Sequence, residues 1–226
     1  MSKTIEDIQY YFIKTIYGDH NSSNNVKKAI KRVLNDMPEN GIGLNIGAGR
    51  TSIDPRVKNL EISDGENIDY VGKAESIPFS ENSLDLIICQ EVLEHTEDFK
   101  AALHEMYRVL KPGGQLYLQT PFIIGYHPCP NDYWRFTNEG INSIVLEANF
   151  KIIDNGESVG VATGFYRIGV EFLSILFSLI VPLLYKPLKA IFAFLFYPIK
   201  WLDSILSFSR ESHRISGGFY IICKKV

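Results

Sequence analysis

The sequence predicts an α/β fold: an open, mostly parallel sheet with helices on both faces. Three observations point to it. Short apolar runs alternate with amphipathic segments through most of the chain, as βαβ units require. A glycine turn follows the first clear run, in "IGLNIGAGR". After a long apolar insertion, the chain closes on another strand-like run, "GGFYIICKKV". Such sheets bind ligands beyond the carboxyl ends of their strands, so candidate site residues should directly follow strands.

The helices and strands can be placed in order. Thr4 and Asp7 resemble a capping box, and the apolar residues from Ile5 to Ile16 fit a first helix. A second helix should cover 26–34 and end near Pro38. The segment "FKAALHEMYRVLKPGG" predicts a helix ended by Pro112 and its glycines, and 138–148 predicts another. Strands are expected at 42–46, 58–63, 83–89, 115–120, 150–154 and 217–226.

The composition excludes several classes of protein. The chain has 226 residues and a net charge of −3, which gives no basic face for nucleic acid. Its three cysteines are far apart and odd in number, which favours a reduced, cytoplasmic compartment. The charged start "MSKTIEDIQYYF" does not fit a secretion signal.

Two motifs follow the first two predicted strands. In Gly47-Ala48-Gly49, glycine allows a tight turn and close approach to a ligand, although an ordinary turn explains the same pattern. The turn lacks the lysine of a phosphate-binding loop, and Ser52 replaces the third glycine of a dinucleotide fingerprint. Glu61 ends the next strand, where its carboxylate can bind both hydroxyls of a ribose or simply face solvent.

The order of motifs carries a specific resemblance. An acidic strand end, "AESIPF", "SLDLI", "VLEH" and "LKPGG" follow one another between Ile42 and Thr120. This pattern resembles the class I S-adenosylmethionine-dependent methyltransferases, most closely the methyltransferase-11 type. The resemblance implies a Rossmann-like, mostly parallel seven-stranded sheet with helices on both faces, and S-adenosyl-L-methionine as cofactor. The apolar helical insertion before the last strand is a feature of this chain's own sequence.

The resemblance also implies roles for residues. Asn45, Gly47, Ala48 and Gly49 would lie against the methionine part of the cofactor, together with Gln90. Glu61 would bind the ribose, and Lys73, Ala74 and Glu75 would flank the adenine. His95, which closes "VLEH", is expected to be structural. Family members often carry acids where this chain has Asn45 and Lys73, and a lysine cannot accept a hydrogen bond. The stretch from Gly49 to Leu60 is also short for the usual first helix.

The loop "PFIIGYHPCPNDYWRFT" follows a predicted strand and would face the methyl group that is transferred. We expect His127 and Asp132 to be catalytic, and Tyr133 and Arg135 to contact the substrate. Alternatively, Asp132 and Arg135 pair only to brace the loop. The spacing of His127 and Cys129 does not match a four-ligand metal site, so no metal is expected.

The insertion contains the stretch Phe172–Asp203, whose uncharged runs are too short to span a bilayer. Polar residues recur along one helix face at Arg167, Glu171, Ser174 and Ser178, and a second stripe carries Lys186, Lys189 and Lys200. This pattern favours a shallow helical hairpin on a membrane surface through 166–209, with lysines toward headgroups. The alternatives are a spanning hairpin with "KPLK" at its tip, a soluble lid and a dimer surface.

Together these patterns predict N-terminal helices at 1–38, a methyltransferase core at 39–162 and 215–226, and the apolar insertion at 163–214. The expected activity is methyl transfer to a small-molecule, sugar or lipid-linked acceptor by a cytoplasmic protein, peripheral on the inner face of a membrane. The alternatives are a non-catalytic membrane-associated protein that retains the fold, and a nucleotide-cofactor oxidoreductase. The acceptor and the oligomeric state do not follow from the sequence.

Overall fold

The computed structural model describes residues 23–49 and 51–226. Its sheet has seven strands in the order β3-β2-β1-β4-β5-β7-β6. The strands are β1 (Gly43–Ile46), β2 (Val57–Glu61), β3 (Tyr70–Val71), β4 (Leu84–Gln90), β5 (Leu110–Pro121), β6 (Phe150–Val159) and β7 (Gly218–Lys225). The pairs β1–β2, β1–β4, β2–β3 and β4–β5 are parallel. This confirms the predicted sheet, and the strand order reverses between β1 and β4, where such folds bind ligands.

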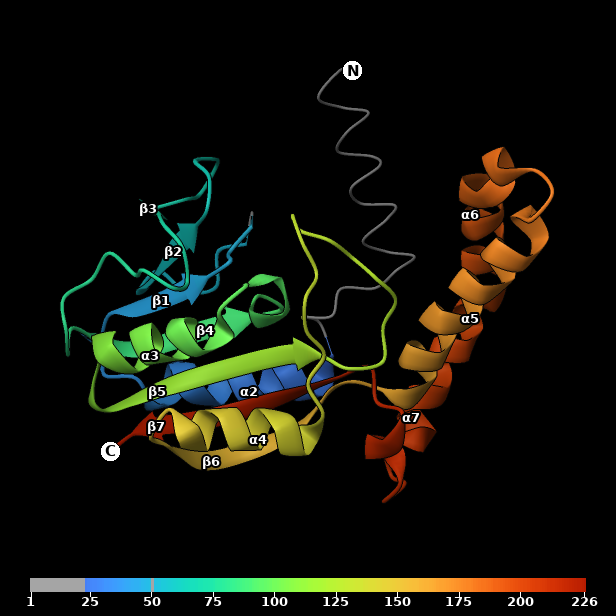
Figure 1. Cartoon of the computed structure of the whole chain (residues 1–226). Coiled ribbons are helices and arrows are strands. Elements are labelled where there is room, and N and C mark those ends of the chain that lie inside the picture. The colour runs from blue at the N-terminus through green and yellow to red at the C-terminus, as the bar shows by residue number, and fades with distance from the viewer. Residues whose placement is uncertain (1–22, 50) are drawn as a thin grey trace. The chain divides into compact units, whose positions relative to one another are not determined.

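Helices cover both faces of the sheet, as Figure 1 shows for α2 (Asn24–Asp36) on one side and α3 (Phe99–Val109) and α4 (Asn138–Glu147) on the other. Successive residues of β4 point to opposite faces. Ile87 and Cys89 belong to the core under α3 and α4, whereas Leu86 and Ile88 belong to the core under α2. Burial on both faces explains why β4 is a continuous apolar run.

Side-chain caps begin two of these helices. The Asp98 carboxylate accepts the N–H of Ala101 at 2.9 Å before α3, and the Thr137 hydroxyl accepts the N–H of Gly140 at 3.0 Å before α4. The predicted end of α3 was wrong. The helix ends at Val109, because Leu110 already pairs with Leu84 in the sheet. The predicted helix at 4–16 lies outside the described residues.

The chain divides into two compact units. One contains the described parts of Asn25–Phe122 together with Tyr126–Gly156 and Phe219–Val226. The other contains Ile123–Gly125 and Glu157–Gly218. The second unit holds α5 (Val161–Ser178), η3 (Pro182–Leu184), α6 (Tyr185–Phe196), η4 (Tyr197–Leu202), α7 (Asp203–Leu206) and η5 (Ser212–Arg214). The domain boundaries expected from the sequence stay a prediction.

Helices α5 and α6 form a hairpin. The Tyr166 hydroxyl donates to the carbonyl of Ala193 at 2.9 Å, and the Lys189 ammonium lies 2.6 Å from the Glu171 carboxylate. The turn falls at 179–184, so the expectation of "KPLK" at the tip was wrong. Pro187 lies in the first turn of α6, where proline is tolerated because the first N–H groups of a helix have no intrahelical partner.

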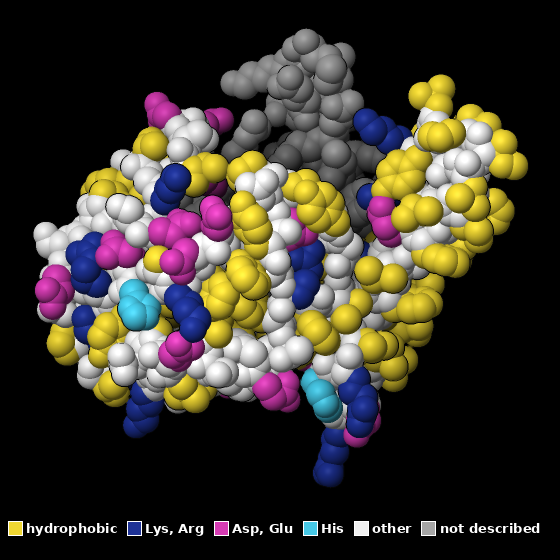
Figure 2. Space-filling model, in the orientation of Figure 1, with side chains coloured by type: hydrophobic (Ala, Val, Ile, Leu, Met, Phe, Trp, Pro, Cys, Tyr) yellow, Lys and Arg dark blue, Asp and Glu magenta, His cyan; other side chains and the backbone are white. Residues whose placement is uncertain are grey.

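The polar stripe of α5 points inward, which corrects the expectation of an outward polar face. Arg167, Ser174 and Ser178 are buried. The outer surface is apolar instead: Ile180 and Leu183 at the tip are 93% and 86% exposed. Figure 2 shows hydrophobic side chains gathered over this hairpin. Within the described part of the chain, Val161–Ser178 is the one helix whose length and composition would allow it to cross a membrane.

Candidate active site

A cavity of about 350 Å³ lies at the carboxyl ends of β1 and β2. Its lining includes the predicted cofactor residues Gly47, Glu61, Lys73, Ala74 and Glu75. The predicted substrate residue Tyr133 lines it too. Residues from distant parts of the sequence therefore meet where the strand order reverses.

The glycine turn and the acid at the end of β2 are hydrogen-bonded to each other. Gly47 has a φ of +67°, and a Cβ added there would lie 2.3 Å from Cγ2 of Val92, so only glycine fits. The N–H of Gly49 donates to Oε1 of Glu61 at 3.1 Å, and the N–H of Ile62 donates to Oε2 at 2.8 Å. A carboxylate has about four acceptor positions, so Glu61 can still accept two hydroxyl groups.

Other predicted cofactor residues lie outside this lining. Asn45 is buried, and its side-chain amide donates to Oδ1 of Asn59 at 3.1 Å. The Gln90 amide donates to Oε1 of Gln119 at 3.2 Å. Ala48, the middle residue of the turn, is buried. The structure therefore does not bring these three side chains to the cavity, and their contact with the methionine part stays a prediction.

The loop after β5 is attached to the short 3₁₀ helix η2 (Leu93–His95) that follows β4. The N–H of Tyr133 donates to the carbonyl of Glu94 at 2.7 Å, and Nδ1 of His95 lies 2.6 Å from the carbonyl oxygen of Asn131. These contacts add Cys129, Asn131 and Tyr133 to the cavity lining.

Within this loop, Arg135 and Asp132 form a two-pronged ion pair. Nη1 of Arg135 lies 2.5 Å from Oδ1 of Asp132, and Nη2 lies 2.6 Å from Oδ2. Asp132 also accepts the N–H of His127 at 2.9 Å. The hydrogen bonds from Arg135 are the main reason that the pKa of Asp132 falls to about 2. Asp132 therefore braces the loop and is a weak proton acceptor at neutral pH.

The sequence reasoning missed Glu94, whose carboxylate is fully buried between two histidines. Its Oε1 lies 3.6 Å from Nε2 of His127 and 3.7 Å from Nε2 of His95. Burial raises the pKa of Glu94 to about 8. The only sequence signal for this site is the acid beside His95 in "VLEH", just after a strand.

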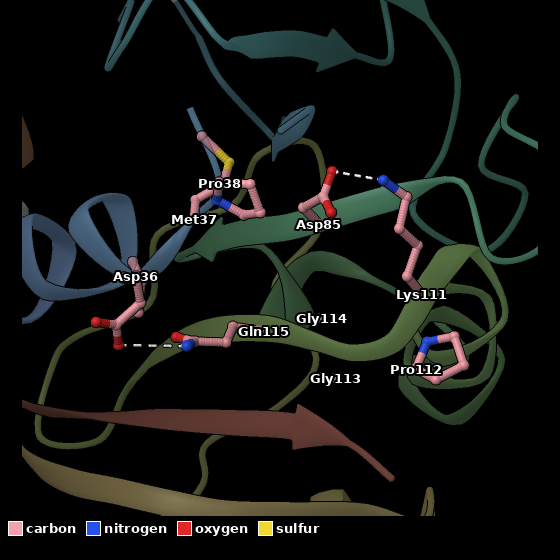
Figure 3. Close-up of a pocket in the computed structure, with 10 residues that line it drawn as sticks. Asp36, Met37, Pro38, Asp85, Lys111, Pro112, Gly113, Gly114 and Gln115 are labelled. Carbon is pink, nitrogen blue, oxygen red and sulfur yellow. Dashed lines mark hydrogen bonds and ion pairs between the residues drawn. The ribbon is translucent and has the colours of Figure 1, made fainter. Parts of the chain in front are cut away.

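A second cavity, of about 230 Å³, lies at the other end of the sheet, beside the start of β4 (Figure 3). The ammonium of Lys111 lies 2.7 Å from Oδ2 of Asp85, and the Gln115 amide donates to Asp36 at 3.3 Å. Asp85 also accepts the N–H of Ile42 at 2.9 Å. These polar groups pair with one another at the end of the sheet opposite the carboxyl ends of the strands. This second cavity is therefore not the expected ligand site.

Comparison with known proteins supports the cavity after β1 and β2 as the functional site. Residues 43–118 match the family model described as a methyltransferase domain. A demethylmenaquinone methyltransferase of Listeria welshimeri is 38% identical over 83 residues, which are 35% of this chain and 35% of that protein. The matched segment thus spans about a third of the length of the curated relatives.

Solved structures share the fold at low sequence identity. Phosphoethanolamine N-methyltransferase 2 of Haemonchus contortus, in complex with phosphomonomethylethanolamine and S-adenosylhomocysteine, aligns with a TM-score of 0.57 and 17% identity, over 97% of this chain and 57% of that one. The [4+2]-cyclase SpnF aligns with a TM-score of 0.54 and 15% identity, over 98% and 94%. The fold alone therefore does not fix the reaction. Residues 43–118 thus resemble a methyltransferase domain in sequence, and the chain has the Rossmann-like fold found in class I S-adenosylmethionine-dependent methyltransferases.

Proposed function

We propose that this protein transfers a methyl group from S-adenosyl-L-methionine to a small-molecule or lipid-linked acceptor, at a membrane surface. The observation that carries the proposal is the cavity after β1 and β2, where the Glu61 carboxylate is hydrogen-bonded to the glycine turn. The match of residues 43–118 to a methyltransferase domain supports the reaction class.

The residues of the cavity fit this cofactor. Its volume of about 350 Å³ lies within the usual range for small-molecule sites. Glu61 would accept both ribose hydroxyls, and Lys73, Ala74 and Glu75 would flank the adenine. Because the Lys73 ammonium cannot accept a hydrogen bond, Glu75 and the backbone of Ala74 would recognise the adenine amino group. When bound, the cofactor supplies a methyl group made electrophilic by its sulfonium.

The loop 126–135 would hold the acceptor. Positioning the acceptor atom about 3–3.5 Å from the methyl group would be the largest catalytic contribution. A hydroxyl acceptor also needs a group that takes its proton, and Nε2 of His127 is our candidate. Asp132 lies 3.4 Å from Nδ1 of His127 and would fix the orientation of that ring.

The acceptor class rests on two observations. The relative from Listeria is named for demethylmenaquinone, a small molecule. In this chain, Tyr126 and Tyr133 in the loop are 77% and 45% exposed, which suits contact with an apolar or aromatic ring.

Membrane attachment is proposed for the α5–α6 hairpin, because its surface is apolar and its polar residues face inward. Exposed apolar side chains continue from the tip along α5, and beside them lies a groove of about 350 Å³ that includes Phe165, Phe172 and Ile199. Lys186 is exposed next to the tip, where it could reach headgroups. Of the other two lysines, Lys189 pairs with Glu171 and Lys200 lies 4.9 Å from the centre of the Tyr197 ring.

The experiment is a transfer assay with methyl-labelled S-adenosylmethionine. The full chain is incubated separately with an organic extract of membranes and with a soluble small-molecule extract. Label in a lipid-extractable product supports the whole proposal, and label only in a soluble product supports methyl transfer but rejects the lipid-linked acceptor. The matched control is Glu61→Ala, which should reduce transfer to either extract when S-adenosylmethionine is below saturation.

Two alternatives have their own outcomes. The first alternative, which Lys73 favours, is a non-catalytic protein that retains the fold. Such a protein would bind S-adenosylmethionine yet transfer no label to either extract. An oxidoreductase would instead bind NAD, although the glycine turn lacks the third glycine of a dinucleotide fingerprint.

A further inference from the structure

We propose that Glu94, His95 and His127 form a binding site for one divalent transition-metal ion beside the cofactor cavity. The three residues each offer one ligand atom, and these atoms all lie within 4.8 Å of one another. The spacing of the sequence did not reveal this site, because His127 is brought to Glu94 only by the folding of the loop after β5.

Within the part of the chain that the structure describes, the Glu94 carboxyl group lacks the hydrogen-bond partners that a buried polar group requires. The Glu94 side chain is 0% exposed, and neither of its oxygens has a hydrogen-bond partner among the residues that the structure describes. A buried polar group without a partner is costly. A cation bound at Oε1 would remove that cost.

The Nε2 atoms of both histidines lie near the same oxygen of Glu94, and for His95 the protonation of the ring can be assigned. Nδ1 of His95 lies 2.6 Å from the carbonyl oxygen of Asn131, which can only accept, so Nδ1 carries the proton. Nε2 of a neutral His95 is then an acceptor, yet it faces the acceptor oxygen of Glu94 at 3.7 Å. Two acceptors that face each other need either a shared proton or a cation between them.

Both histidines also have the outer partner that metal-bound histidines usually have. For His95 this partner is the carbonyl of Asn131. For His127 it is the Asp132 carboxylate, 3.4 Å from Nδ1. Nη2 of Arg135 also lies 3.2 Å from Nδ1 of His127. Binding of an ion at Nε2 would place a proton on Nδ1, which would then donate to Asp132 instead of accepting from Arg135.

Two of the three distances between ligand atoms are close to those of a tetrahedral site, and the third is within 4.8 Å. Ligand atoms about 2.0–2.2 Å from a tetrahedral ion lie roughly 3.4 Å apart. The Oε1–Nε2 distances of 3.6 and 3.7 Å are close to this value. Two imidazoles and a carboxylate favour zinc, iron or manganese over magnesium or calcium. Because His95 lines the cofactor cavity, the fourth position can face it.

A role for the ion in catalysis rests on the proposed function. An acceptor hydroxyl bound to the ion would give up its proton to solvent water more readily, and His127 would then be a ligand instead of the proton acceptor. Binding of the ion does not depend on methyl transfer, so it is tested separately.

The experiment titrates the chelator-treated full chain with Zn²⁺, Mn²⁺ and Mg²⁺ against a chromophoric chelator, and records the visible spectrum with Co²⁺. We expect one ion per chain, with Zn²⁺ bound far more tightly than Mg²⁺. His95→Ala and Glu94→Gln should weaken Zn²⁺ binding by at least about 100-fold, more than the 10–100-fold expected for an outer partner such as Asp132→Asn. The exposed His104→Ala is the matched control and should bind like wild type.

Equal Zn²⁺ affinity of the wild type, His95→Ala and folded Glu94→Gln would show an adventitious ion and overturn the proposal, as would a wild-type chain that binds no ion. S-adenosylmethionine binding is measured on the same samples. Metal binding without cofactor binding would reject the proposed function and leave the metal site standing, and the reverse result would reject only the metal site.

Discussion

The N–H of Gly49 donates a 3.1 Å hydrogen bond to Oε1 of Glu61, which ties the glycine turn after β1 to the acid that ends β2. One carboxylate therefore fixes the shape of the turn and still has acceptor positions for a ligand. Glu61 and Gly47 of the turn both line the cavity, so a ligand in it can contact both.

Replacing this acid should weaken cofactor binding. In Glu61→Ala the two ribose contacts are lost, and hydrogen bonds to a charged group contribute about 1.5–3 kcal/mol. We expect the Kd for S-adenosylmethionine to rise about 10-fold to 100-fold. The exposed Glu66→Ala is a control with the same change in charge. An unchanged Kd in folded Glu61→Ala would reject the ribose assignment.

The cysteines give an independent probe of the cavity. Cys89 and Cys223 are buried, and burial raises both thiol pKa values, that of Cys223 to about 12. Cys129 is exposed and lines the cavity. We expect one thiol per chain to react quickly with a disulfide reagent, and S-adenosylmethionine to slow that reaction. Cys129→Ser should abolish the fast phase, and a fast phase that persists in this variant would contradict the structure.

The sequence predicted the central strands of the sheet well because they are buried, whereas the short, exposed β3 was not among the predicted strands. Apolar runs such as Leu84–Gln90 have few other stable placements, and the turn at Gly47 and the acid at Glu61 follow from strand ends. The sequence did not predict features that depend on tertiary structure, such as the direction in which a helix face points. The polar stripe at Ser174 and Ser178 has the same spacing whether it faces water or a second helix. The pairing of Glu94 with His127 depends on the path of a loop, which periodicity does not encode.

The loop residue His127 should affect turnover more than cofactor binding. We expect His127→Ala to lower kcat by about 10²–10⁴-fold, the usual contribution of a proton acceptor, with the Kd for S-adenosylmethionine nearly unchanged. Calorimetry and single-turnover transfer on the same sample separate the two quantities. Normal turnover in His127→Ala would show that the loop is only structural.

An ion pair at the start of β2 predicts a pH effect on stability. Hydrogen bonds from Arg56, at 2.9 Å and 3.1 Å, lower the pKa of Asp54 below 3.8. Because the folded pKa is the lower one, the ion pair stabilises the fold above pH 3.8, and this contribution is lost as the pH falls through the folded value. Asp54→Asn should lower Tm by about 2 °C at pH 7. A loss of Tm that stays the same as the pH falls progressively below 3.8 would contradict this assignment.

The apolar tip of the hairpin should control vesicle binding. Ile180→Asp with Leu183→Asp removes two exposed apolar side chains, each contributing about 1.5–3 kcal/mol when buried in lipid. We expect at least a tenfold loss of binding to anionic vesicles in flotation assays, with Tm unchanged because both side chains are exposed. Ser209→Asp adds a charge elsewhere in the same unit and should bind like wild type. Equal binding of both variants would reject membrane attachment through the tip.

The central claim is that the cavity between the glycine turn and Glu61 binds S-adenosylmethionine. Isothermal calorimetry of the full chain with S-adenosylmethionine, and separately with NAD, tests it most directly. The account predicts one saturable site per chain for S-adenosylmethionine, weakened in Glu61→Ala, and no binding heat with NAD. Saturable binding of NAD with none for S-adenosylmethionine, in a folded sample, would contradict it.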